Sequence, residues 1–181
     1  MSNSLNPYRL DSGAKQAFVR WWQRISDDKA ESWARADRAS LKHAHDVLAL
    51  TCTPAYQRVY QDMLAARGGV AWPAYQQDRI AAMVGLAAHV KKGNSPEPLS
   101  LPKAMSYRPE GVDRNPVSEL RFLRLLDAPD IDALYLGLRR CLPLIKSQID
   151  VALMADDLFE WGDWVKKRWA YDYRWPDKAT A

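Results

Sequence analysis

Apolar residues recur every three or four positions along most of the chain, which is the period of a helix with one buried face. The clearest stripe runs from Leu120 to Leu126 and stops before Pro129, since proline disfavours helical backbone in the residue before it. Asp130 then caps a second helix whose apolar positions reach Ile145. Further helices are expected through 18–25, 41–48, 56–64, 80–87 and 151–169, with a short one at 100–105.

Capping and helix-breaking residues predict where several of these helices begin and end. Ser12 is a candidate cap for the first helix, and Thr53–Pro54 places proline in a first turn, where its missing N–H costs nothing. The pair Gly68–Gly69 ends that helix. Residues 91–93 close the next one, where two lysines suit the negative end of a helix dipole. Pro143 is expected to bend the end of its helix.

The absence of alternating apolar runs predicts an all-α protein, a helical bundle in two lobes. Prolines at 96, 98, 102, 109 and 116 interrupt any long element between residues 93 and 116. We therefore expect an N-terminal lobe over 1–92, a Pro-rich linker with a short helix over 93–116, and a C-terminal lobe over 117–181.

Composition bounds the class of protein. The net charge is +4, which by itself says little about partners. No segment reaches the roughly 18 apolar residues of a membrane span, and the first residues lack the apolar core of a signal peptide. We expect a cytoplasmic protein with no membrane partner. Cys52 and Cys141 lie far apart in apolar contexts, which favours two reduced, buried thiols. Most of the eight tryptophans suit a bulky core, with one or two as candidates for base stacking.

The chain lacks the motifs of the common enzyme classes, so no catalytic residue, metal or cofactor is predicted. There is no glycine-rich phosphate loop, nucleophile elbow or pair of closely spaced cysteines. His43, His45 and Asp46 resemble the His-Asp doublet of metal phosphohydrolases, but the two histidines face opposite ways on a helix. Asp156 and Glu160 share a helix face, and we interpret them as solvated charges.

Basic residues gather in particular segments and are the candidate site. Those at 35, 38 and 42 share one helix face, as do those at 121 and 124, while 139 and 140 are adjacent and point differently. A solvated surface or pairing with acids such as Asp132 is the competing interpretation. Recurrence in both lobes favours binding to nucleic-acid phosphates. The candidates are Arg35, Arg38, Lys42, Lys103, Arg121, Arg124, Arg139 and Arg140.

Five segments, taken in order, carry a resemblance to a known family. They are SWARADRASLKHA (32–44), SLPKAM (100–105), SELRFLRLLDAPDIDALYLGLRRCLPLI (118–145), the doublet Arg139–Arg140 within it, and WGDWVKKRWAYDY (161–173). Together they resemble the CasB family, the small subunit of the type I-E CRISPR surveillance complex Cascade. The resemblance extends over about residues 15–175.

The resemblance implies a non-catalytic protein that helps to hold the target and displaced DNA strands of an R-loop, while base pairing to the guide RNA carries specificity. It implies as partners the other Cascade subunits, the guide RNA, both DNA strands and a second copy of the chain. Lys42, Lys103, Arg121 and Arg140 match basic positions of the family best. Basic character is less regular at Arg124, and His43 replaces a residue that is often basic.

Two alternatives remain open from the sequence. A helical scaffold would bind only protein partners, and salt-sensitive binding of single-stranded DNA separates it from a nucleic-acid-binding subunit. A metal phosphohydrolase of the His-Asp type would carry metal when purified.

Overall fold

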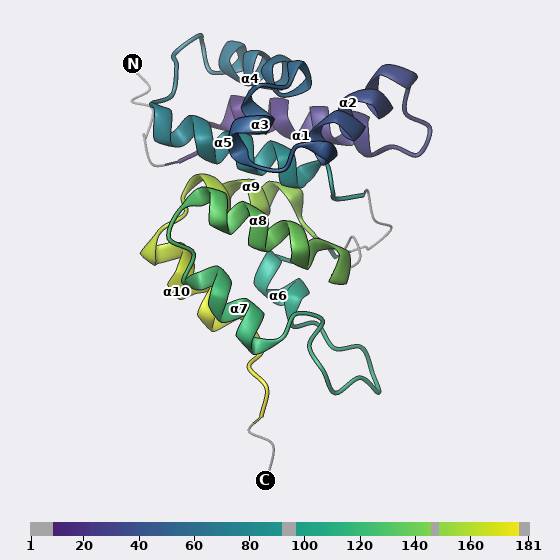
Figure 1. Ribbon diagram of the computed structural model, residues 1–181, viewed down its shortest axis with the longest axis vertical. Coiled ribbons are helices and arrows are strands. Elements are labelled where there is room, and N and C mark those ends of the chain that lie inside the picture. Colours follow the sequence, from purple (N-terminus) through teal and green to yellow (C-terminus); the bar gives the residue numbers. More distant parts are fainter. Residues whose placement is uncertain (1–8, 92–96, 146–148, 178–181) are drawn as a thin grey trace.

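The computed structural model describes residues 9–91, 97–145 and 149–177, and within these ranges the fold is all-α, as predicted (Figure 1). These residues form ten α-helices, one 3-10 helix and no strand beyond an isolated bridge between Leu99 and Ile149. The elements are α1 (Ser12–Ser26), α2 (Ser32–His43), α3 (Val47–Thr51), α4 (Pro54–Ala66), α5 (Ala74–Ala87), α6 (Leu101–Met105), α7 (Glu119–Leu126), α8 (Ile131–Cys141), η1 (Leu142–Leu144), α9 (Val151–Phe159) and α10 (Asp163–Asp172).

Helix α5 lies at the centre of the molecule because its second half is apolar on every side. All residues from Ile80 to Ala88 are buried. Gly85 allows two neighbours to approach, since a Cβ there would lie 2.5 Å from Leu50 on α3 and 3.1 Å from Tyr135 on α8. A larger residue at 85 would have to displace the Leu50 and Tyr135 side chains.

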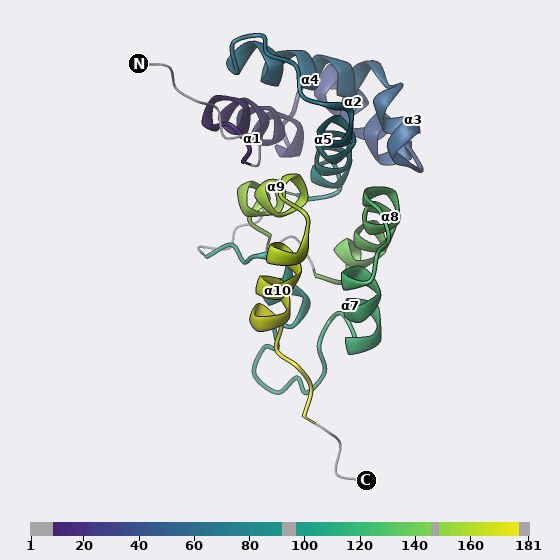
Figure 2. The ribbon, with the colours of Figure 1, turned by 90° about the vertical axis from the view of Figure 1, so that its left-hand side faces the viewer.

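Figure 2 shows α1–α5 at one end, with α7 and α8 on one side below them and α9 and α10 on the other. The buried residues of both groups belong to one hydrophobic core, in which α5 packs against α8 and α9. Aromatic rings join α7 to α10, since Phe122 stacks on Tyr173 with 3.9 Å between ring centroids. The division into lobes with boundaries at 93 and 116 stays a prediction.

The predicted helix over 41–48 is wrong, because the chain breaks at 44–46 between α2 and α3. Asp46 caps α3 by accepting a hydrogen bond from the Ala49 N–H at 2.7 Å. The Asp132 carboxylate accepts the Val47 N–H at 2.8 Å. These bonds satisfy the free donors at the start of α3, so capping prevails over apolar periodicity.

The predicted helix over 151–169 is also wrong as one element. α9 ends at Phe159, Trp161 turns into the core, and α10 begins after Gly162. Both α9 and α10 keep the helical spacing of apolar residues, because each packs its own face on the core. The turn between them is therefore not visible in the sequence pattern.

Three smaller predictions also need correction. The cap of α1 is Asp11, not Ser12, and its carboxylate accepts the N–H groups of Gly13 and Ala14. Helix α5 ends at Ala87, so Lys91 lies beyond its last turn, and 92–93 lie outside the described residues. Cys52 is exposed, whereas Cys141 is buried as expected, and both thiols are free. The predicted bend at Pro143 is confirmed as the 3-10 segment η1.

Candidate nucleic-acid interface

Helix α2 carries the first three candidates along one face, as its sequence predicts. Arg35 donates to the Ala30 carbonyl at 3.0 Å, which holds its stem near the start of the helix. Arg38 donates through Nε to the Ala88 carbonyl at 2.9 Å and so reaches across to the end of α5. Its Nη2 is buried without a partner in the described part of the chain. Lys42 is exposed.

Arg139 joins α8 to the break after α2. Its Nη1 donates to the Ala44 carbonyl at 2.8 Å and its Nη2 to the Lys42 carbonyl at 2.9 Å. The suggested pairing of one of the two adjacent arginines with Asp132 is not found, because neither forms an ion pair with a described acid; the Asp132 carboxylate accepts the Val47 N–H. Both hydrogen bonds go to uncharged carbonyls, and no acid among the described residues forms an ion pair with this guanidinium, so its positive charge is not neutralised.

The α2 face and the end of α5 enclose two hollows. The larger, of about 510 Å³, has Asp27 and Asp28 on its rim as its acidic residues. The smaller, of about 220 Å³, continues toward η1 and Ile149. Lys42 and Lys91 line both, so the two hollows share a basic edge. The basic residues and histidines around them are Arg35, Arg38, Lys42, His43, His89 and Lys91.

The positive charges around the hollows act on the side chain of His89. Its pKa is lowered to about 4, first by burial and then by the charges of Arg139, Lys42 and Arg38. Its Nε2 is buried and lacks a partner among the described residues. An anion in the smaller hollow, which His89 lines, would relieve the charge repulsion and give His89 Nε2 a hydrogen-bond partner. We call Arg38, Lys42, His89, Lys91 and Arg139 the His89 cluster.

The sequence missed two members of the His89 cluster. The sequence pattern interprets Lys91 as part of a helix end and indicates no binding role for His89. A histidine and a lysine that follow a buried helix are only a weak indication of a binding site in the sequence. The closeness of these two residues to α2 and α8 depends on tertiary packing. The structure adds them and brings them to Arg38, Lys42 and Arg139.

The remaining candidates do not join this cluster. Lys103 on α6, Arg121 and Arg124 on α7 and Arg140 on α8 are exposed, and none lines either hollow. Arg121 lies close enough to Cys141 to oppose the rise in the thiol pKa that burial causes. The exposed charge of Arg121 therefore lies near the end of α8 that carries Arg140.

The His-Asp doublet lies in the break between α2 and α3. His45 contacts its neighbour Asp46 at 3.1 Å, and Asp46 serves as the cap of α3. In the part of the chain that the structure describes, no group of three or more His, Cys, Asp or Glu residues is arranged to hold a metal ion.

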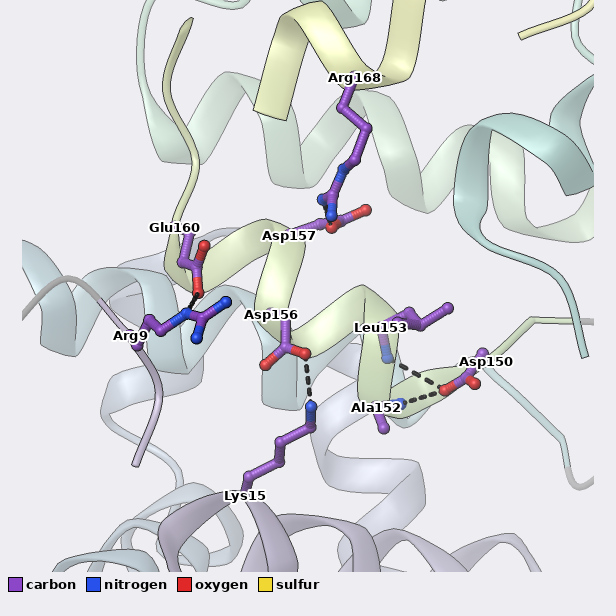
Figure 3. A network of polar contacts seen from close by, with 9 residues as sticks. All are labelled: Arg9, Lys15, Asp150, Ala152, Leu153, Asp156, Asp157, Glu160 and Arg168. Carbon is purple, nitrogen blue, oxygen red and sulfur yellow. Dashed lines mark hydrogen bonds and ion pairs between the residues drawn. The ribbon is translucent and has the colours of Figure 1, made fainter. Parts of the chain in front are cut away.

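The sequence predicts that Asp156 and Glu160 are solvated charges, but in the structure both are ion-paired (Figure 3). Asp156 binds Lys15 of α1, and Glu160 lies 3.8 Å from the Arg9 guanidinium. Asp157 is buried between Arg168 and the Trp169 indole, and burial raises its pKa to about 6 although both partners lower it. These contacts link α9 to neighbouring elements and have a structural role.

No described helix is long and apolar enough to cross a membrane.

Comparison with known proteins gives a consistent result. Residues 37–173 match the family model of CRISPR-associated protein Cse2. A CRISPR-associated protein Cse2 from Thermus thermophilus is 30% identical over 164 residues, which cover 87% of this chain and 88% of the relative. The crystal structure of CasB from T. thermophilus matches with a TM-score of 0.57 at 25% identity, over 88% of this chain and 96% of that chain.

A chain in the crystal structure of Escherichia coli Cascade, bound to a PAM-containing double-stranded DNA target, matches with a TM-score of 0.60. The match covers 90% of this chain and 97% of that chain at 20% identity, so this likeness concerns the fold alone.

Proposed function

Because the chain belongs to the family of CRISPR-associated protein Cse2, we propose that it is the small subunit of a type I-E CRISPR surveillance complex. It binds nucleic-acid strands through their phosphates and stabilises the R-loop without catalysis. Its partners are the other Cascade subunits, the guide RNA, the target and displaced DNA strands, and a second copy of itself.

The observation that carries this proposal is the His89 cluster. Burial lowers the pKa of His89 at the end of α5 most, and the charges of Arg139 from α8 and of Lys42 and Arg38 from α2 lower it further. Like charges repel one another, so the convergence of Arg38, Lys42 and Lys91 beside the two hollows suits an anionic ligand. Phosphates of a nucleic-acid backbone are such a ligand, and they are bound without reading sequence.

A modest binding energy is enough for this role. Forming an R-loop exchanges one duplex for another of similar stability, so a few phosphate contacts shift the balance toward the open state. The exposed charges of Arg121 and Arg140 extend the basic surface along α7 and α8. A strand that follows these residues needs no pocket for its bases.

The proposal is tested by the salt dependence of binding to a labelled single-stranded DNA. Lys42→Ala with Lys91→Ala removes two exposed charges from the edge that both hollows share. We expect weaker binding, and a log–log salt slope that is flatter by about 1.4, since each single-strand phosphate contact contributes about 0.7. Arg20→Ala with Arg114→Ala removes the same charge from exposed positions that line neither hollow.

The outcome distinguishes binding at the His89 cluster from binding elsewhere, and a nucleic-acid-binding subunit from a scaffold that binds only proteins. Equal affinity and slope in the cluster variant and the control variant would place the phosphate contacts elsewhere and contradict the assignment of the His89 cluster. No salt-sensitive binding by the wild-type protein would favour the scaffold that binds only proteins.

A further inference from the structure

The outer face of α10 carries aromatic and basic side chains that the fold does not use. Trp164 and Tyr171 are 70% and 91% exposed. They are seven positions apart in the sequence, so they share a helix face about 10 Å apart. Lys167 is exposed between them, and Arg174 follows just beyond the end of the helix. None of these four side chains has a hydrogen bond, ion pair or ring contact with another residue that the structure describes.

The inner face of α10 is fixed by packing, which holds the outer rings in place. Val165 and Trp169 are fully buried, and the Trp169 indole donates to the Asp157 carboxylate at 2.7 Å. Just past the helix, Tyr173 donates its hydroxyl to the Val117 carbonyl at 2.7 Å. A ligand on the outer face therefore meets a preformed surface and need not order the helix.

The composition of this face differs from an apolar docking surface. Its exposed large side chains are aromatic, whereas the exposed face of α7 presents the aliphatic Leu120 and Leu123. Asp163 is the exposed acid at the start of α10, and Asp172 is half-buried. Flat aromatic faces beside unpaired cations suit an unpaired strand, whose bases stack while its phosphates need positive charge.

We propose that Trp164 and Tyr171 are stacking platforms for bases of a single-stranded nucleic acid, with Lys167 and Arg174 on its phosphates. This inference rests on the proposed function and adds to it, because the His89 cluster contacts only the backbone whereas α10 contacts the bases. Stacking is tolerant of sequence, since every base has a π-face, and it requires that the strand be unpaired. The surface therefore distinguishes an open strand from a duplex.

The test compares two probes of equal length and charge, an oligothymidylate and an abasic oligonucleotide, each binding to the full chain. In Trp164→Ala with Tyr171→Ala, we expect affinity for oligothymidylate to fall about ten-fold or more. Affinity for the abasic probe and the salt slope should stay at their wild-type values. Trp164→Phe should retain most of the affinity, since it keeps a flat ring.

Trp33→Ala is the matched control. Trp33 is 40% exposed, but Arg24 covers one face of its ring and its indole donates to Glu31, so this side chain already has partners within the fold. This variant should bind both probes as the wild type does. The thermal midpoint of each variant confirms folding, which these exposed positions should leave unchanged.

Other outcomes would overturn the inference. If wild-type protein binds both probes equally, or the double variant loses both equally, α10 does not stack bases, although the proposed function stands. If the wild-type protein binds neither probe, both proposals fail. Loss of assembly with other subunits, with oligothymidylate binding intact, would assign this face to a protein partner.

Discussion

Arg139 of α8 donates hydrogen bonds to the Ala44 carbonyl at 2.8 Å and to the Lys42 carbonyl at 2.9 Å. Its neighbour Arg140 is exposed and donates no such bond to a residue that the structure describes. Adjacent arginines therefore have different roles. Arg139 satisfies main-chain carbonyls after α2 and adds positive charge near His89, whereas Arg140 exposes its charge to solvent.

The first prediction uses this adjacent pair. Arg139→Ala should lower the free energy of unfolding by about 2 kcal/mol, because it leaves two main-chain carbonyls without their charged donor. Arg140→Ala should leave stability unchanged and weaken binding of single-stranded DNA. Urea unfolding and a salt titration of binding measure the two effects. Equal stability of both variants would show that the Arg139 bonds contribute little.

The second prediction concerns the pH dependence of stability. The pKa of His89 is about 4 in the folded protein, below its ordinary 6.5, so the unfolded chain binds more protons between these values. The stability that neutral His89 contributes is present above about pH 6.5 and is lost as the pH falls toward 4. His89→Gln cannot titrate, and its free energy of unfolding should fall less between pH 7 and pH 4.5.

Urea unfolding at several pH values measures this difference. His43→Gln, an exposed change beside the larger hollow, which His89 does not line, is the control and should follow the wild-type curve. Parallel curves for wild type and His89→Gln would contradict the low pKa.

The third prediction concerns catalysis. His45→Ala with Asp46→Ala should cost about 1 kcal/mol of stability, since Asp46 caps α3. We expect no metal-dependent phosphodiester hydrolysis in the wild type for this change to remove, and DNA binding should stay near normal. Release of nitrophenol from bis(p-nitrophenyl) phosphate with Mn²⁺ is the assay. An activity that copurifies with the protein and disappears in the double variant would overturn the non-catalytic assignment.

The fourth prediction tests the boundary between the predicted lobes. Arg114 is exposed in the long connection between α6 and α7, where few main-chain groups are hydrogen-bonded. Limited trypsin digestion should therefore cleave first after Arg114. The fragments should stay together, because α5 packs against α8 and α9. First cleavage after Arg67, before the Gly68–Gly69 turn, would argue against a junction near 93–116.

The sequence alone determined the all-α class and most of the helices, because apolar periodicity records which face of each helix is buried. It also carried the resemblance to the CasB family, which the family match confirms. Spacing placed Arg35, Arg38 and Lys42 on one face, as α2 has them. These features depend on neighbours in the chain, so local pattern reveals them.

Tertiary structure decided everything that depends on residues distant in sequence. The break at 44–46 follows from Asp132 and Arg139, which lie about ninety residues away and satisfy main-chain groups there. His89 and Lys91 became part of the site only because α5 ends beside α2 and α8. A periodic pattern shows that a face is buried but not which partner covers it, and binding surfaces are assembled from such partners.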